Sequence, residues 1–491
     1  AGDINDDGFD DVIVGAPGYE TAHGAGAVFA WYSADGGIPY GTPDNCDWTF
    51  HDGDGSTFMG GSVDCAGDVN GDGFADVIIG ASAYSGAVEH GGAAFVFHGS
   101  DDGLEADWAW YRDNDQDGAA YGLAVAGIGD MNGDGYSDVA VGAPYFDNGE
   151  SDEGRVSVHL GSADGVQPGP PWWTAEADQA ISALGFSLDG AGDVNGDGYG
   201  DLIVGAPWWD GISDFVGAAM LWYGGPTAPP PGTPDNAARV WAWLIADAQF
   251  GQSVAGAGDV DGDGLDDVVI GCPYNDGTYA NEGFAIVYRG SDDGPEGNWD
   301  WLVTGPHADA HFGDCVAGAG DVNGDGFSDI LVGAQGYSGP QADEGRASMY
   351  YGGGGRGTVR AARQWQADLV GRLGPLGESD TVDGFGLTVR ARSPRGRGLV
   401  RYEYEVEPHG TPFDGQGTVL GPWTGVGAPG NWSDLSAEVS GLTAGTPHVW
   451  RIRVVGRSPY FPRSPWQTLS WNGVSEHDLR TAGGGVGVGD Y

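Results

Sequence analysis

Short apolar runs separated by glycine-rich polar turns recur along the first three quarters of the chain. A Phe-Gly-x-x-Val segment such as residues 250–254 leads into an acidic turn, and an apolar run such as residues 330–334 follows that turn directly. A third run such as residues 283–288 and a tryptophan-bearing run such as residues 299–301 complete the set. Runs of this length bounded by turn residues indicate β-strands. The pattern predicts four short antiparallel strands per repeat.

The acidic turn is the most regular part of each repeat. Its nine residues carry oxygen-bearing side chains at the first, third, fifth and ninth positions and a glycine at the sixth. The turns begin at residues 3, 68, 130, 193, 259 and 321, so consecutive starts are separated by 65, 62, 63, 66 and 62 residues. A fixed period of this size predicts units that bury their faces against one another. With four strands each, the units are expected to be blades of a β-propeller.

The spacing of these oxygens is typical of a site for a hard cation. Ca2+ takes about six to eight oxygen ligands, and the four side chains with the backbone carbonyl of the seventh residue supply most of that shell. An EF-hand loop begins similarly but closes on a Glu at its twelfth position, between helices. Here the closing Asp leads into a strand. We therefore predict about six Ca2+ sites. The expected ligands, turn by turn, are Asp3, Asn5, Asp7, Phe9 and Asp11; Asp68, Asn70, Asp72, Phe74 and Asp76; Asp130, Asn132, Asp134, Tyr136 and Asp138; Asp193, Asn195, Asp197, Tyr199 and Asp201; Asp259, Asp261, Asp263, Leu265 and Asp267; and Asp321, Asn323, Asp325, Phe327 and Asp329.

The net charge fits bound cations and restricts the choice of partners. The chain of 491 residues has a formal net charge of −53 at pH 7. Much of the acid lies in the turns, so without cations the clustered charges are expected to repel one another and loosen the turns. So acidic a surface argues against nucleic acid as a partner. No apolar run is long enough for insertion into a membrane.

The distribution of arginine indicates a second domain. All 19 basic residues are arginine, and only five of them precede residue 350. Residues 399–406 and 449–455 alternate apolar and charged side chains, as half-buried strands do. We expect the arginines of this region to face solvent. The predicted all-β organisation is a six- to seven-bladed propeller over residues 1–372, a linker over 373–384, a β-sandwich over 385–480 and a Gly-rich tail over 481–491.

The motifs resemble the FG-GAP repeats of integrin α-subunit propellers and their bacterial relatives. The resemblance covers residues 1 to about 370 and rests on the Phe-Gly lead-in, the Asp-x-Asn-Gly-Asp-Gly turn and Gly-Ala-Pro, as at residues 15–17, 142–144 and 205–207. It implies seven blades, extracellular placement, Ca2+ in the turns on one face and ligand contact through loops on the other. Residues 442–448 are similar to a corner of fibronectin type III domains.

Some features have two interpretations. The number of blades is six or seven, because no seventh acidic turn follows Trp365, which is expected on the last strand of the sixth unit. Residues 385–389 repeat the lead-in pattern and either close the ring or open the next domain. The sequence begins inside a repeat, so we expect its true start, and any export signal, upstream. Cys46 with Cys65, and Cys272 with Cys315, are either disulfides or free thiols. The tryptophans of the fourth strands are expected to pack between units.

Two classes of function are compatible with the sequence. We favour a non-enzymatic, secreted or cell-surface adhesion or structural protein that is stabilised by Ca2+. Its partner is a protein or glycan, or copies of itself joined into a filament when the tail donates a strand to a neighbour. The alternative is an extracellular hydrolase of polysaccharide or lipid head groups with a site in the propeller centre. The sequence has no Gly-x-Ser-x-Gly or His-Glu-x-x-His motif, which favours the first class.

Overall fold

The structure is a computed structural model of the whole chain, and its described part is all-β. It describes residues 2–5, 10–21, 24–33, 38, 41–51, 55–114, 116–211, 215–261, 265–291, 293–295, 297, 299, 301–320, 322, 327–341, 343–352, 363–365, 367, 369, 377–379, 381, 383–391, 398–408, 417–426, 433–456 and 479–480. Within these ranges the one helical element is the 3-10 turn η1 (Pro43–Asn45). We find no helix there with the length and apolar character that a bilayer crossing requires.

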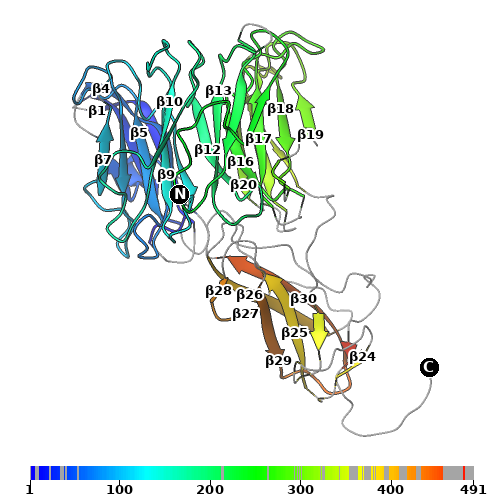
Figure 1. Cartoon of the computed structure of the whole chain (residues 1–491). Coiled ribbons are helices and arrows are strands. Elements are labelled where there is room, and N and C mark those ends of the chain that lie inside the picture. The colour runs from blue at the N-terminus through cyan, green and yellow to red at the C-terminus, as the bar shows by residue number, and fades with distance from the viewer. Residues whose placement is uncertain are drawn as a thin grey trace.

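Six units of antiparallel strands follow one another in the order that the repeats predict (Figure 1). Units one and two share a seven-stranded sheet, units three to five are four-stranded sheets and unit six has three strands. The strands of units one to three are β1 (Val12–Thr21), β2 (Gly24–Trp31) and β3 (Trp48–Phe50); β4 (Gly55–Gly67), β5 (Asp76–Ala81), β6 (Ala93–Phe97) and β7 (Trp110–Asp113); and β8 (Val125–Gly129), β9 (Asp138–Ala143), β10 (Arg155–His159) and β11 (Trp173–Glu176). Those of units four to six are β12 (Ser187–Gly192), β13 (Asp201–Ala206), β14 (Ala218–Trp222) and β15 (Arg239–Ala242); β16 (Val254–Gly258), β17 (Asp267–Cys272), β18 (Phe284–Tyr288) and β19 (Trp301–Thr304); and β20 (Phe312–Gly320), β21 (Asp329–Ala334) and β22 (Arg346–Tyr350).

The strand after each acidic turn is the centre of its unit. In units two to five this strand is buried along its whole length. Successive side chains of a strand point to opposite faces of the sheet, so each unit packs against both neighbours. Val77 and Ile79 of β5 pack with Val28 of unit one, whereas Ile78 packs with Val139 of unit three. The continuous apolar runs of the sequence are therefore strands covered on both sides.

Every junction between units contains the same aromatic contact. The tryptophan of the last strand of one unit packs on the aromatic or histidine ring near the end of the third strand of the next, with ring centroids 4.8–5.5 Å apart. The five pairs are Trp48–Phe97, Trp110–His159, Trp173–Trp222, Trp241–Tyr288 and Trp301–Tyr350. Aromatic pairs stabilise by about 0.5–1.5 kcal/mol beyond their buried area. The prediction that the tryptophans pack between units is confirmed at these five places.

Close backbone contacts also join the units. The glycine of each Gly-Ala-Pro segment faces the carbonyl oxygen of the lead-in glycine of the following unit, as Gly142 faces Gly185. A Cβ atom on Gly142 would lie 2.1 Å from that oxygen, and the equivalent glycines of units one, two, four and five meet the same obstacle at 1.9–2.0 Å. Gly333 of unit six differs, because the nearest atoms to its Cβ position belong to Cys315 of its own unit, at 3.5 Å. Among the described residues, unit six has no following neighbour at this point.

Trp365 does not lie where the period predicts. It lies on β23 (Arg363–Trp365), which pairs with β25 (Phe385–Ala391) of the C-terminal domain, and its indole N–H donates to Thr388 Oγ1 at 2.8 Å. Its assignment to the sixth unit is therefore wrong. Residues 385–389 open this domain rather than closing the ring.

The C-terminal domain consists of two sheets that enclose one apolar core. One sheet has the order β23-β25-β29, and the other has the order β24-β31-β30-β26-β27 with β28 on β26. Phe385 and Leu387 from the first sheet meet Trp450 and Ile452 from the second, all at 0% exposure. The remaining strands are β24 (Gly377–Glu378), β26 (Gly398–Pro408), β27 (Val419–Leu420), β28 (Thr424–Val426), β29 (Ser433–Val439), β30 (Pro447–Gly456) and β31 (Leu479–Arg480).

Two expectations for this region need correction. β24 lies within the expected linker but pairs with β31, so that part of the linker belongs to the domain. Arg453 does not face solvent: its Nε donates to Glu403 across the sheet at 2.7 Å, and both residues are buried. Arg451 binds Glu405 in the same way, at 2.8 Å. The cysteines had two interpretations, and all four are free thiols here. The predicted tail, residues 481–491, lies outside the described residues.

Candidate metal centre

The aspartate at the ninth position of each acidic turn is fixed by two backbone groups. One carboxylate oxygen accepts the N–H of the second residue of the turn, and the other accepts the N–H of the second residue after the third strand of the repeat, at 2.8–3.1 Å throughout. In unit two these donors are Val69 and Gly99, which both bind Asp76. The six aspartates are Asp11, Asp76, Asp138, Asp201, Asp267 and Asp329, each at most 2% exposed. The sequence did not predict this anchoring role, because any residue type can supply a backbone N–H. Its only sign in the sequence is the Gly or Ser that lies 22 or 23 residues after each aspartate and supplies the second donor.

The other oxygen-bearing side chains shape the turn itself, as unit two illustrates. Asp68 accepts the N–H groups of Gly71, Asp72 and Gly73 at 2.6–3.1 Å. Asn70 Nδ2 donates to Asp72 Oδ2 at 2.8 Å, and the N–H of Asp72 donates to Asn70 Oδ1 at 2.9 Å. Gly71 and Gly73 have φ of 76° and 102°, a region that favours glycine. The turn of unit three repeats these contacts around Asp130, Asn132 and Asp134.

Burial makes these carboxylates costly to ionise without a counter-charge. Desolvation raises the pKa of Asp76 to about 8, and the negative charges of Asp68 and Asp72 add to the effect. Burial likewise raises the pKa of Asp138, Asp201 and Asp267 well above the ordinary value. A cation at this place would oppose both effects, because it favours the charged carboxylates beside it.

The acidic turns are joined to one another by the backbone. The N–H of the eighth residue of each turn donates to the carbonyl of the first residue of the preceding turn, as Ser137 does to Asp68 at 3.0 Å. The bond recurs at all five junctions, with donors Ala75, Ser137, Gly200, Asp266 and Ser328 and distances of 2.9–3.2 Å. The turns therefore form one connected row along an edge of the array.

In the fifth turn, three of the predicted carboxylate ligands lie close together. Asp259, Asp261 and Asp267 can each place a carboxylate oxygen within 4.8 Å of the others. Elsewhere in the described residues, one more group of three acidic side chains meets this distance, Glu153 with Glu176 and Asp178. The donor set of the turns, carboxylates with amide and backbone carbonyl oxygens, fits a hard cation.

The structure describes most of the predicted ligands but not all of them. The complete sets of units two, three and four lie in described turns, as do Asp3, Asn5 and Asp11 of unit one. Asp259, Asp261, Leu265 and Asp267 of unit five and Phe327 and Asp329 of unit six are also described. The predicted ligands outside the described residues are Asp7, Phe9, Asp263, Asp321, Asn323 and Asp325.

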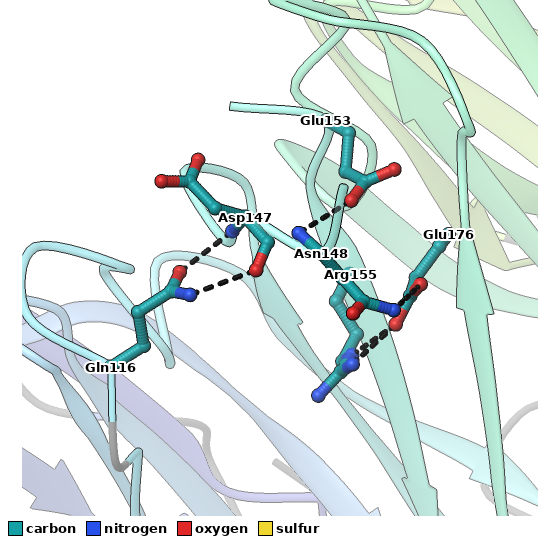
Figure 2. Close-up of polar contacts among 6 residues, drawn as sticks. All are labelled: Gln116, Asp147, Asn148, Glu153, Arg155 and Glu176. Atoms are coloured by element: carbon teal, nitrogen blue, oxygen red, sulfur yellow. Dashed lines mark hydrogen bonds and ion pairs between the residues drawn. The ribbon is translucent and has the colours of Figure 1, made fainter. Parts of the chain in front are cut away.

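The second acidic group lies at the opposite end of the strands, where it holds loops together (Figure 2). Arg155 Nε donates to Glu176 Oε1 at 2.6 Å, and Asn148 donates from its backbone to Glu153 and from its side chain to Glu176. Next to it, the amide of Gln116 donates to the carbonyl of Asp147 at 2.8 Å and accepts its N–H at 2.6 Å. Gln179 clamps Asp210 in the same way one unit later. Glu153 and Glu176 are thus engaged by the protein's own donors.

Comparison with known sequences identifies the repeats. The FG-GAP repeat matches residues 1–31, 60–97, 121–159, 185–241, 250–288 and 316–359, about half of the chain, and each match contains one acidic turn. The chain belongs to the FG-GAP repeat family. The six FG-GAP matches correspond to the six units of strands.

Several relatives of this FG-GAP protein are integrin α-chains. It is 35% identical to integrin alpha pat-2 of Caenorhabditis elegans over 226 residues, which are 43% of this chain and 17% of the relative. It is 30% identical to integrin alpha-PS2 of Drosophila melanogaster over 240 residues, 46% of this chain and 16% of the relative. It is 46% identical to integrin alpha-IIb of Mus musculus over 86 residues, 18% of this chain and 8% of the relative. The chain thus spans less than a fifth of each of these relatives.

Proposed function

We propose that this FG-GAP protein is a non-enzymatic extracellular or cell-surface protein of adhesion or structural type, stabilised by Ca2+ in its six acidic turns. The observation that carries the proposal is the repetition of one oxygen-rich turn in six units, each closed by a buried aspartate anchored on two backbone N–H groups. One such turn would be a surface loop of little consequence. Six joined turns, four of which contain a carboxylate whose pKa is raised by burial, favour a cation at each.

The residues of unit two illustrate the proposed site. Asp68, Asn70, Asp72 and Asp76 with the carbonyl of Phe74 would hold the ion, and Ca2+ would supply positive charge that offsets the repulsion among the three carboxylates. The backbone bonds of Asp68 and Asp76 keep their oxygens in place before the ion arrives. The hydrogen bond from the N–H of Ser137 to the carbonyl of Asp68 would then help to order the acidic turn of unit three.

The integrin relatives favour a protein ligand, bound by the loops at the strand ends opposite the acidic turns. A glycan ligand and association with further copies of the chain are the other partners that we propose. In the second case residues 481–491 would donate a strand to a neighbouring copy and build a filament. Removing residues 481–491 should then abolish filaments seen by electron microscopy, with an unchanged melting temperature as the control for folding. Filaments formed by the shortened chain would contradict strand donation.

Removal of the cation tests the proposed stabilisation directly. In excess chelator the melting temperature is expected to fall by roughly 10 °C or more, because an ion bound only by the folded state stabilises it. Limited proteolysis should then cut within the acidic turns, and added Ca2+ should reverse both effects while Mg2+ restores them less. An unchanged melting curve in chelator would contradict stabilisation by Ca2+.

A further inference from the structure

The fifth acidic turn differs from the others in charge at the four positions whose side chains are predicted to bind the ion. Its third position is Asp261, whereas the other five turns have asparagine there. The turn therefore carries four carboxylates at its side-chain positions instead of three. Asp261 is buried at 5% exposure, and its oxygens lie close to those of Asp259 and Asp267. Placing a further buried negative charge among like charges is unfavourable unless a positive charge accompanies it.

Arg289 supplies that positive charge. It follows β18 directly and precedes Gly290, the residue whose N–H binds Asp267. Its Nη1 lies 3.0 Å from Asp261 Oδ2. Tyr32, His98, Leu160, Tyr223 and Tyr351 occupy this position in the other units, so no other unit has an arginine there. The extra acid and the extra base are thus paired within one unit.

We infer that Arg289 acts as a built-in cation, which keeps the fifth acidic turn folded without metal. The inference rests on the proposed function, since it separates one turn that stays folded after its ion leaves from five that need the ion to stay folded. With Arg289, the four carboxylates of unit five carry the same net charge as the three of another unit. Arginine stays charged at any physiological pH and presents several donors in a fixed plane. It can therefore hold Asp261 permanently, whereas a bound ion leaves when its concentration falls.

Asp266 of the fifth turn also binds the fourth turn. Asp266 Oδ2 accepts the N–H of Asp193, the first residue of the fourth turn, at 2.8 Å. The backbone N–H of Asp266 also donates to the carbonyl of Asp193 at 3.2 Å. If Arg289 keeps the fifth turn folded, these two contacts should also hold Asp193 of the fourth turn in place when the ions are removed.

Hydrogen exchange measured peptide by peptide tests this inference. In the full chain, removal of Ca2+ by chelator should speed exchange in residues 68–76 and 130–138 roughly tenfold or more, as expected for local opening. Residues 258–267 should change less than about twofold. In Arg289→Gln, chelator should open residues 258–267 as much as the other turns. Arg289→Lys, which keeps the charge, should retain at least part of the protection. Should Arg289→Gln fail to fold, Asp261→Asn with Arg289→Tyr serves as the second variant, because it introduces the residues that unit four has at these two positions, and it should open in chelator.

The outcomes separate this inference from the proposed function. If chelator opens no turn, stabilisation by Ca2+ is wrong, and so is the special role of Arg289. If chelator opens residues 258–267 of the unaltered chain together with the other turns, Arg289 does not replace the ion, although the proposed function stands. Unchanged protection of residues 258–267 in chelator in both variants would also overturn the role of Arg289.

Discussion

Single aspartates have two different tasks in the acidic turns. The ninth residue is buried and holds two backbone segments together, whereas the fifth residue is more exposed and closes the turn on itself. In unit four, Asp201 accepts the N–H groups of Val194 and Gly224. Asp197 accepts the N–H of Tyr199 and the side-chain amide of Asn195. The two residues should therefore respond differently to removal of their carboxylates.

Asp201→Ala and Asp197→Ala form a matched pair. Asp201→Ala leaves two buried N–H groups without an acceptor, so we expect a loss of about 2–4 kcal/mol in unfolding free energy, with or without Ca2+. Asp197→Ala should cost about 1 kcal/mol or less in chelator, because water reaches its former partners. The larger loss of unfolding free energy for Asp197→Ala should appear in the presence of Ca2+. Urea unfolding in both conditions measures the difference. Equal losses for the two variants in chelator would show that the ninth residue is not an anchor.

His159 makes the stability of the array sensitive to acid. Its Nε2 lies 2.9 Å from Tyr121 Oη, its ring packs on Trp110, and burial, with Arg112 nearby, lowers its pKa to about 3. The unfolded chain binds this proton near pH 6.5, so stability is complete above pH 6.5. It should fall by about 1.4 kcal/mol per pH unit as the pH drops toward 3.

His159→Phe, which copies Phe97 of unit two, should remove this part of the pH dependence. The variant is expected to lose about 1 kcal/mol at pH 7, where the bond to Tyr121 is broken, and to approach or exceed the unaltered chain at pH 5. Urea unfolding between pH 7 and 5 gives both slopes. Parallel slopes would mean that His159 does not titrate on unfolding in this range.

At the scale of elements, the junction between units rests on one aromatic pair and one glycine contact. Gly142 has the carbonyl oxygen of Gly185 where its Cβ would lie, whereas Gly333 has only ordinary contacts with Cys315. Both glycines occupy the same position in their strands. The cost of a methyl group therefore reports whether another unit follows.

Gly142→Ala and Gly333→Ala test this difference. Gly142→Ala forces a unit to move and should lower the unfolding free energy by about 3 kcal/mol or more, or prevent folding. Gly333→Ala should cost less than about 0.5 kcal/mol. Thermal unfolding of the two variants side by side makes the comparison. A large cost at Gly333 would mean that another segment packs against unit six.

The sequence predicted the strands, their period and the tryptophans at the junctions, because residue type and spacing carry these features. It did not reveal the N–H groups that bind Asp76, since any residue type can supply a backbone donor. The period placed Trp365 on the sixth unit, but a period does not determine which sheet edge receives a strand, and β23 joins β25. The pattern of residues 399–406 predicted a strand correctly. The partners of Arg451 and Arg453 depend on the register between β26 and β30, which the pattern does not specify.

At the scale of the whole molecule, two kinds of contact join the six similar units. Aromatic and glycine contacts join the sheets, and backbone bonds join the acidic turns into a row. Each turn contacts the next, so an ion bound in one turn should help to order its neighbour. Loss of ions is therefore expected to loosen one edge of the array while the apolar cores between the sheets remain.

Binding of Ca2+ in the acidic turns is tested most directly by an anomalous-scattering map from crystals grown in Ca2+ or soaked with Tb3+. We expect a peak in each acidic turn. In unit two, Asp68, Asn70, Asp72, Asp76 and the carbonyl of Phe74 should lie about 2.3–2.6 Å from the ion. Turns without a peak at millimolar Ca2+, their carboxylates bonded to backbone N–H groups or water alone, would contradict it.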